Sequence, residues 1–416
     1  MAARPQRGVG YPQRVALREA GDVRRLILGR ALRGFADGVV SVVLPAYLIA
    51  LGRTPFQVGA IATSTLLGSA ATTLGVGLLA HRLSARGTLL AAAVLMLATG
   101  VGFAGAAGFW PLMAIAFLGT LNPSVGDVSL FLPIEQSQLA ARVAAPERAA
   151  VYARYNLAGT LAAALGSLAS AFPEALARGA GLQPRDALRS AFGLYAAAGL
   201  AIAVLYLGLS PASASRQAAP SRPLGRSRRV VLQLAALFSL DSFGGGFVVQ
   251  SLLALWLFRR FQFSLADAAQ VFFAASLLSA LSQLVSPRLA ARLGLVRTMV
   301  YTHLPANAFL VLAALMPSPS LAVACLLLRM TLSSMDVPAR QAYVMGVVAP
   351  EERAAAASVT NVPRSLGAGV APLLAGWLLG RSSFGWPLLL AGGLKIAYDL
   401  LLLAQFRHRE AEAGGA

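Results

Sequence analysis

Charge is scarce in this chain. Only 12% of its 416 residues are charged and only 16 are Asp or Glu, whereas hydrophobic residues make up 57%. A soluble globular domain carries about 25% charged residues, so this chain cannot cover a water-facing surface of ordinary polarity. The composition therefore excludes an ordinary soluble protein and predicts an integral membrane protein whose surroundings are the lipid bilayer.

Cysteine and histidine are nearly absent. Cys325 is the single cysteine, so no intramolecular disulfide can form, and the three histidines, His81, His303 and His408, lie far apart in sequence. We expect no metal site and no cofactor. The chain also lacks a Gly-x-x-x-x-Gly-Lys-Ser/Thr loop and a Gly-x-Ser-x-Gly motif, so we expect neither direct ATP driving nor enzyme activity.

The net charge of +19 comes from arginines placed in short segments between apolar runs. A nucleic-acid binder gathers such residues on one polar domain, so nucleic acid is not an expected partner. The positive-inside rule explains the pattern: with the N-terminus in the cytoplasm, most arginines fall on the cytoplasmic side. Both termini are then cytoplasmic, the Arg-rich start precedes a retained helix rather than a cleaved signal, and the expected location is the plasma (inner) membrane.

A membrane-spanning helix needs about 20 largely apolar residues. Twelve runs predict such helices, which makes the expected fold all-α and polytopic: 27–50, 56–79, 88–107, 111–139, 155–172, 190–209, 230–258, 266–287, 298–316, 320–348, 355–379 and 385–405. The predicted organisation is a cytoplasmic tail at 1–26, a six-helix bundle at 27–209, a linker at 210–229, a six-helix bundle at 230–405 and a tail at 406–416. The Pro-, Ser- and Arg-rich linker is predicted to be a flexible tether, with binding of anionic lipid headgroups as an alternative role.

The two halves repeat one another. Three matches share one offset close to half of the chain: residues 133–136 with 338–341, 147–150 with 352–355, and Asn156 with Asn361. Two similar halves in a very apolar chain are typical of a duplicated transporter.

A basic loop follows the second apolar run of each half, at residues 77–87 and 287–294. The first copy resembles the loop Gly-x-Leu-Ala-Asp-Arg-x-Gly-Arg-Lys of the major facilitator superfamily, and the two six-helix halves with a long central loop resemble that family as well. The resemblance implies two pseudo-symmetric bundles and secondary transport by alternating access. In the family the acidic residue of this loop helps to latch the inward gate. It is replaced by His81 and Ala291, so a latch of that kind is either absent here or built from other residues.

Ionisable residues within the predicted spans are costly to insert and therefore mark functional positions. Asp37, Asp127 and Glu135 are our candidates for proton coupling, because a carboxylate in a low-dielectric cavity can carry a proton near neutral pH. For Asp37 and Asp127, hydrogen bonding between helices is the alternative. The candidates for the substrate cavity are Arg33, Tyr47, Asn156, Asp241, Arg329, Asp336, Arg340, Asn361 and Arg364.

Sequence spacing suggests several ion pairs. Arg33 with Asp37, and Lys395 with Asp399, are four residues apart and share a helix face. Glu135 and Arg340 hold equivalent positions in the repeat, which predicts a pair between the halves near the inner gate that breaks as the halves rock, with pairing inside each half as the alternative.

Two further sets of charges have alternative roles. Arg329 and Arg364 could contact an anionic substrate group or neutralise Asp336 or Asp127. A cytoplasmic ionic gate is predicted from charges on the inner loops, with solvated surface pairs as the alternative; its members are Arg82, Arg86, Glu147, Arg148, Arg292, Glu352 and Arg353.

The first predicted helix and its exit, residues 35–38, 44–48 and 54–59, also resemble the drug-efflux-like branch of the family. We therefore expect a monomeric secondary transporter that couples protons to the efflux of a small amphipathic substrate, with the bilayer as its other partner. Uptake or exchange of an organic anion is the second expectation, motivated by the buried arginines. A membrane receptor or scaffold without transport is the alternative from another class.

Overall fold

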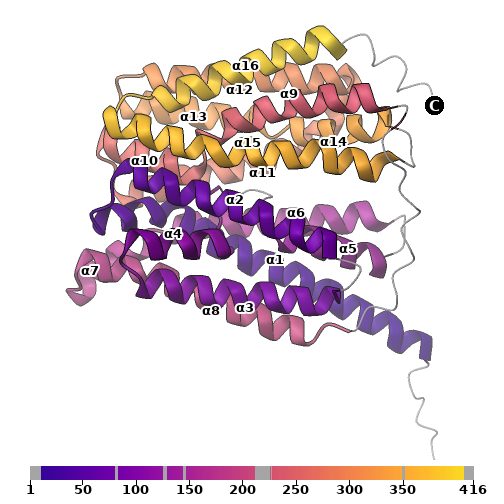
Figure 1. The fold of residues 1–416 in the computed structure, drawn as a ribbon, viewed down its shortest axis with the longest axis horizontal. Coiled ribbons are helices and arrows are strands. Elements are labelled where there is room, and N and C mark those ends of the chain that lie inside the picture. The colour runs from indigo at the N-terminus through magenta and orange to yellow at the C-terminus, as the bar shows by residue number, and fades with distance from the viewer. Residues whose placement is uncertain are drawn as a thin grey trace, which may run out of the picture.

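The structure is a computed structural model, which describes residues 11–79, 83–124, 129–143, 147–210, 225, 227–348 and 352–406. Within these ranges every regular element is a helix, and no strand is present. The helices of the first half lie together in the lower part of Figure 1: α1 (Tyr11–Ala50), α2 (Pro55–Leu79), α3 (Ala85–Gly105), α4 (Phe109–Leu118), α5 (Phe131–Arg142), α6 (Arg148–Ala169), α7 (Phe172–Ala180) and α8 (Pro184–Leu207).

The helices of the second half lie beside the first, in the middle and upper part of the same view: α9 (Arg228–Gly246), α10 (Gln250–Phe261), α11 (Leu265–Leu293), α12 (Leu295–Leu315), α13 (Pro319–Ser333), α14 (Asp336–Val347), α15 (Arg353–Arg381) and α16 (Trp386–Phe406). The end of α8 and the start of α9, which border the central linker, lie at one end of the two bundles together with the last turn of α16 (Figure 1). We call this end the linker face and the other end the opposite face.

The prediction of an all-α polytopic protein is confirmed. Among the described residues, 11 segments are long and apolar enough to cross a membrane. The remaining predicted span, 111–139, is present as the short apolar helix α4 followed by α5. Three further spans also comprise paired helices, α6 with α7, α9 with α10 and α13 with α14.

The helix breaks have local causes. After α4 ends at Leu118, Pro123 lacks an amide hydrogen and disfavours helical backbone at the residue before it. Between α9 and α10, the run Gly244–Gly246 precedes three non-helical residues, and consecutive glycines weaken a helix. The two breaks touch, because the amide of Ser251 donates to the carbonyl of Pro123 at 3.0 Å. The breaks therefore lie where the two halves meet.

The two halves pack mainly through two helix pairs, α2 with α15 and α6 with α11. Near the opposite face, α2 and α15 approach closely at Gly59 and Gly376, where a Cβ on either residue would collide with the backbone of the other helix. Glycine at both positions thus allows the two helices to close this end of the interface.

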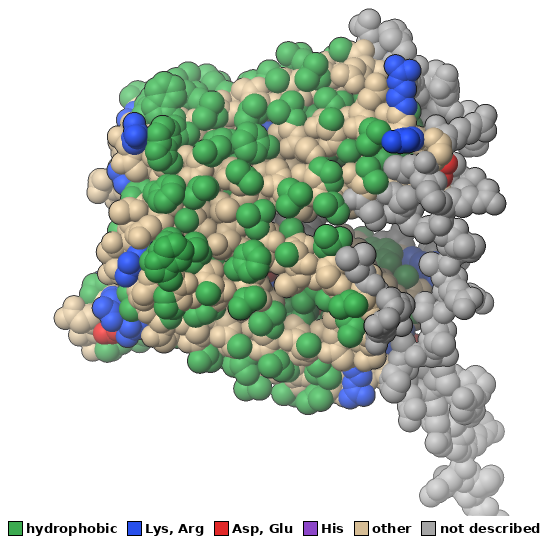
Figure 2. Space-filling view, in the orientation of Figure 1, with side chains coloured by type: hydrophobic (Ala, Val, Ile, Leu, Met, Phe, Trp, Pro, Cys, Tyr) green, Lys and Arg blue, Asp and Glu red, His purple; other side chains and the backbone are tan. Residues whose placement is uncertain are grey.

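The outer surface of the bundle is largely apolar. Figure 2 shows hydrophobic side chains along the length of both halves, with Lys and Arg gathered at the two ends. Exposed Leu200 and Val204 on α8, and Val94 and Val101 on α3, belong to this surface. Such a band suits contact with lipid. The same view is hollowed between the halves near the linker face (Figure 2).

Candidate functional site

A small polar pocket of about 140 Å³ lies at the interface between the halves. Helices α1 and α6 line one side of it, and α10, α11 and α13 line the other. The lining residues are Arg30, Gly34, Asp37, Ser124, Gly159, Thr160, Ala163, Gln250, Ser276, Ser279 and Met330. We call it the central pocket. Because both halves line it, relative movement of the halves would change its exposure to either end.

Asp37 is the single carboxylate among the described residues that line the central pocket. Its side chain is 4% exposed, and the amide of Asn122 hydrogen-bonds to it. Asn122 is held in turn by Ser124, whose hydroxyl and backbone amide both donate to its Oδ1. The Oδ1 atom of Asp37 has no hydrogen-bond partner among the described residues. A buried carboxylate oxygen without a partner is unfavourable, so this atom is available to a proton or a ligand.

Gln250 connects the two halves next to Asp37. Its amide nitrogen donates to the hydroxyl of Ser41 at 3.0 Å and to that of Ser167 at 3.2 Å. Gln250 is the first residue of α10, directly after the break that follows α9. The break therefore allows a side chain of the second half to reach α1 and α6.

A buried ionic cluster of the first half lies on α1 beside this pocket. Arg33 makes a two-pronged pair with Glu135, at 2.6 Å and 2.8 Å. The hydroxyls of Tyr155 and Tyr206 also donate to this carboxylate, and the guanidinium lies 4.5 Å from the centre of the Phe131 ring. Each oxygen of the Glu135 carboxylate thus accepts two hydrogen bonds, one from Arg33 and one from a tyrosine.

This geometry corrects the pairing of Arg33 with Asp37, and in the described conformation the pair of Glu135 with Arg340 is not formed. Glu135 pairs with Arg33 of its own half and not with Arg340, and Arg33 pairs with Glu135 rather than with Asp37. The i,i+4 spacing showed that Arg33 and Asp37 share a helix face. It could not show that α5 brings a second carboxylate, that of Glu135, to Arg33.

A second buried ionic cluster lies inside the second half. Asp241 of α9 pairs with Lys395 of α16 at 2.6 Å and with Arg340 of α14 at 3.2 Å. Arg340 also pairs with Asp336 one helical turn away, at 3.4 Å. In this structure Glu135 and Arg340 therefore each pair with a residue of their own half, as the alternative interpretation expected.

Lys395 and Asp399 do not pair along α16 as their spacing predicted. Lys395 turns to Asp241, while Asp399 contacts His303 at 2.9 Å and accepts a hydrogen bond from the amide of Asn307 at 2.9 Å. The packing of α12 against α16 brings His303 and Asn307 to the carboxylate. These two residues escaped the sequence argument because one histidine and one asparagine form no motif.

Two arginines of the second half have no carboxylate partner among the described residues. Arg329 is partly buried and makes one contact to the sulfur of Met330 at 3.3 Å. Arg364 donates to the hydroxyl of Ser242 at 3.1 Å and to the side-chain oxygen of Asn361 at 3.2 Å. Asp336 is neutralised by Arg340 instead, so the expected neutralisation of Asp336 by Arg329 or Arg364 is not observed.

The other cavity candidates occupy different environments. Tyr47 is fully buried in the first half, where its hydroxyl donates to the carbonyl of Phe103 at 2.9 Å, so it belongs to the core rather than to the central pocket. Asn156 is exposed one turn before Thr160 on α6, and Asn361 is exposed on α15. Asp127 lies outside the described residues.

The predicted gate residues form other contacts at the linker face. Arg86 donates to the carbonyl of Leu207, Arg148 donates to that of Val143, and Glu352 accepts hydrogen bonds from the amides of Gly225 and Ser227. Glu147 and Arg292 are exposed. Arg82 and the side chain of Arg353 lie outside the described part of the chain. The ionic gate stays a prediction.

Several residues of the central pocket were missed. Arg30 is 9% exposed and lines the pocket, yet its place at the end of an Arg-rich stretch suggested a cytoplasmic position. Arg30, Gly34 and Asp37 share the helical spacing that could have identified one pocket-facing stripe. Gln250, Ser276 and Ser279 carry no charge, so the cost of burying a charge did not mark them.

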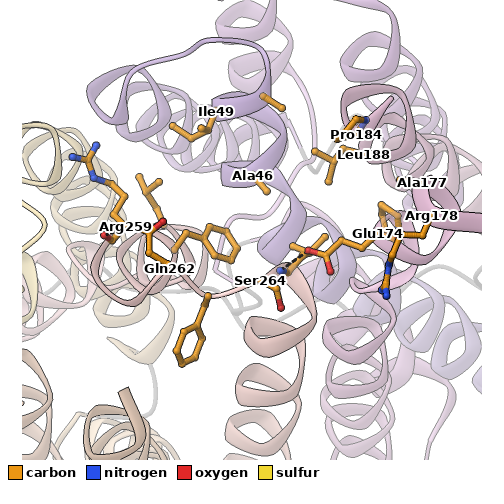
Figure 3. Close-up of a pocket in the computed structure, with 16 residues that line it drawn as sticks. Ala46, Ile49, Glu174, Ala177, Arg178, Pro184, Leu188, Arg259, Gln262 and Ser264 are labelled. Atoms are coloured by element: carbon orange, nitrogen blue, oxygen red, sulfur yellow. Dashed lines mark hydrogen bonds between the residues drawn. The ribbon is translucent and has the colours of Figure 1, made fainter. Parts of the chain in front are cut away.

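A larger cavity of about 770 Å³ lies between the halves at the opposite face (Figure 3). Its walls are mostly apolar and come from α1, α7 and α8 on one side and from α10 and the start of α11 on the other. Across it, the carboxylate of Glu174 accepts a hydrogen bond from the backbone amide of Leu265 at 2.7 Å (Figure 3). The buried charges lie elsewhere, so we place the candidate site at the central pocket.

These observations define a polytopic α-helical membrane protein with a polar pocket between two bundles. The model of the Major Facilitator Superfamily matches residues 26–361. The chain belongs to this family and is a membrane transporter of it. In the part of the chain that the structure describes, no group of three or more His, Cys, Asp or Glu residues could hold a metal ion.

Similar proteins agree with this assignment. The membrane protein YJR124C of Saccharomyces cerevisiae is 24% identical over 92% of this chain and 94% of its own length. Among solved structures, the nucleoside transporter NupG has a TM-score of 0.70 at 14% identity, covering 92% of this chain and 99% of NupG. A bacterial homologue of the human lysosomal transporter Spinster, in an inward-facing conformation, has a TM-score of 0.66 at 15% identity, covering 93% and 95%. At these identities the structural likeness concerns the fold.

Proposed function

We propose that this protein is a secondary transporter that exchanges protons for a small amphipathic solute by alternating access, in the direction of efflux. The observation that carries the proposal is the placement of Asp37. Its carboxylate is buried in a pocket lined by both halves, and one of its oxygens has no partner among the described residues. A proton, or a hydrogen-bond donor or cation of the solute, would satisfy that oxygen. Competition between the two for one atom is a physical basis for exchange.

The arginine distribution supports a cytoplasmic linker face. In that orientation the hollow seen near the linker face opens to the cytoplasm, and the contacts at Gly59, Gly376 and Glu174 close the outer side. The described conformation is then inward-open. We further propose that the protein resides in the inner membrane and works as a monomer, because the solute path lies between the two halves of a single chain.

The test is proton movement in proteoliposomes that contain a trapped pH-sensitive dye and are challenged with a panel of amphipathic amines, nucleosides and organic anions. Wild type should show solute-evoked proton flux, and Asp37→Asn should lose it. Asp186→Asn, which removes an exposed carboxylate from a surface pair with Arg189, is the matched control. Solute movement in wild type without proton movement would point to a uniporter or exchanger and reject proton coupling.

A second function, transport of an organic anion, is favoured by a separate observation. Arg30 lines the central pocket. Arg329 lies on α13, which lines the same pocket through Met330, and has no carboxylate partner among the described residues. Guanidinium groups match carboxylates and phosphates. A solved structure of the human organic anion transporter MFSD10 shares 19% identity and a TM-score of 0.58 with this chain, covering 92% of it and 99% of MFSD10, a likeness that concerns fold alone. The solute panel separates the two functions.

A further inference from the structure

A histidine lies between two carboxylates inside the second half. The Nδ1 atom of His303 is 2.9 Å from Asp399, and its Nε2 atom is 3.8 Å from Asp241. The three side chains come from α12, α16 and α9, and each is at most 6% exposed. Asp399 is fully buried. Nothing in the proposed exchange at Asp37 uses these groups.

The two carboxylates differ in their counter-charges. Asp241 has Lys395 and Arg340 as permanent cations. Asp399 contacts only His303 and the neutral amide of Asn307 among the described residues. Among the described residues, His303 is therefore the one side chain in contact with Asp399 that can supply a positive charge, and histidine gains or loses its proton near neutral pH.

The remaining neighbours do not change this conclusion. Asp336 of α14 is balanced by Arg340, and Tyr398 of α16 lies edge-on to the His303 ring with centroids 6.0 Å apart. Arg329 of α13 and Arg364 of α15 act on Asp241 from beyond ion-pair distance. From α11, the other neighbour of α12, no described ionisable residue contacts the cluster.

The burial of Asp399 thus requires a proton. With one proton shared between His303 and Asp399, the pair is neutral overall. Without it, an unpaired carboxylate charge would remain fully buried, which folded proteins avoid by rearranging or by admitting water. Loss of the proton should therefore loosen the contact of α12 with α16 and, through Asp241, with α9.

We propose that His303 and Asp399 form a proton-binding site inside the second half, whose occupancy sets the conformation of the transporter. This inference deepens the proposed proton coupling and rests on it. Asp241 joins the site to α9, which continues into α10 and the bridging side chain Gln250. The protonated pair stabilises the described conformation, which is hollowed at the linker face.

The first measurement is the titration of His303 itself. In a His81→Gln/His408→Gln background, His303 is the only histidine, so one imidazole signal is followed by NMR from pH 5 to 9 in nanodiscs. The signal should change with pH as the pair of His303 and Asp399 loses its shared proton, and this change should accompany the change in conformation. A signal that does not change over the whole pH range would overturn the proposal.

The second measurement is conformation against pH without any solute. Cys325 is replaced by Ser, and spin labels are placed on Ala150→Cys and Arg297→Cys, which are exposed near the linker face on opposite halves. Raising the pH should shift the distance between the two labels from long to short. If the change in conformation releases one proton, the ratio of the two conformations changes by up to about tenfold per pH unit. The shift should disappear in the double variant His303→Gln/Asp399→Asn and persist in Asp186→Asn.

The double variant removes both ionisable groups and keeps hydrogen-bonding side chains, so it is the form expected to fold if His303→Gln alone does not. A wild-type pH shift in the double variant would overturn the proposal. These measurements need no solute, so the two proposals can fail separately. A pH-sensitive conformation without solute-evoked proton flux would reject the proposed function, whereas proton-coupled transport with an unchanged pH response in the double variant would reject this site.

Discussion

Glu174 of α7 and Leu265, the first residue of α11, join the two halves at the opposite face through a 2.7 Å hydrogen bond from the Leu265 amide to the carboxylate (Figure 3). The start of α11 is further stabilised by a capping box between Ser264 and Asp267. An anionic side chain at a helix N-terminus is favourable because the first amides have no partner within the helix. The contact therefore works as a latch on this end of the interface.

We expect Glu174→Ala to favour opening of the opposite face. A hydrogen bond to a charged group contributes about 1.5–3 kcal/mol, which corresponds to roughly a 10- to 150-fold change in the population ratio. Glu174→Gln should have a smaller effect because its side-chain carbonyl still accepts the bond. The measurement is the distance between spin labels on Trp110→Cys and Trp386→Cys in the Cys325→Ser background, since both tryptophans are exposed on opposite halves. Unchanged distances in Glu174→Ala would contradict the latch.

The pair of Arg33 and Glu135 should be required for stability. Removing one partner of a buried ion pair costs about 3–5 kcal/mol because the other charge stays buried. We expect Glu135→Gln and Arg33→Gln each to lower the thermal midpoint strongly in detergent. The double variant Arg33→Gln/Glu135→Gln should recover most of the loss. Asp186→Asn, in an exposed pair, should cost at most about 1 kcal/mol.

A charge exchange tests whether Glu135 and Arg340 pair between the halves. Because Glu135 contacts Arg33 and not Arg340, exchanging the charges as Glu135→Arg/Arg340→Glu should not restore the stability lost in Glu135→Arg. Recovery in that exchanged variant would support the sequence-based pair, and it would require a conformation in which α5 and α14 meet.

The sequence was sufficient to predict an all-α polytopic fold and the approximate positions of its spans, because hydropathy reports on which segments can face lipid. It did not predict the breaks at Leu118 and Gly246. A proline and a glycine run permit a break, but membrane helices tolerate both. That the two broken segments contact each other is seen only in the structure, in the hydrogen bond from the Ser251 amide to the carbonyl of Pro123.

The candidate site was harder to predict. The cost of a buried charge marked Asp37, Glu135 and Asp241 correctly as buried, but it could not assign their partners, which depend on how helices far apart in sequence pack. Lys395 illustrates this: it lies four residues from Asp399 and pairs with Asp241, 154 residues earlier. The cost of burying a charge gave no information on neutral residues such as Gln250.

Arg329 should separate the two proposed substrate classes. If the solute is an organic anion held by this guanidinium, Arg329→Gln should raise KM by roughly 10- to 100-fold, as expected for loss of a hydrogen bond to a charged group. If the solute is an amphipathic cation, the same variant should leave KM unchanged or lower it. Arg297→Gln, an exposed arginine on α12, is the control for a change in overall charge. The KM values of both variants are measured by counterflow kinetics in proteoliposomes.

The two borders of the central linker are held by one carboxylate in each half. Asp22 of α1 accepts from the amide of Ser210 at 3.2 Å and also pairs with Arg142 at 3.1 Å. Glu352, just before α15, accepts from the amides of Gly225 and Ser227, both at 3.1 Å. The chain is thus fixed to the first half where it leaves α8 and to the second half where it enters α9.

Because each carboxylate holds different amides, the two borders should respond independently. We expect Glu352→Ala to accelerate hydrogen exchange at Gly225 and Ser227 by roughly 10- to 100-fold, the loss expected for hydrogen bonds to a charged acceptor, and to leave Ser210 unchanged. Asp22→Ala should do the reverse. Exchange measured by mass spectrometry on the two peptides tests this directly, and acceleration at both borders in either single variant would show that the halves loosen together rather than at separate anchors.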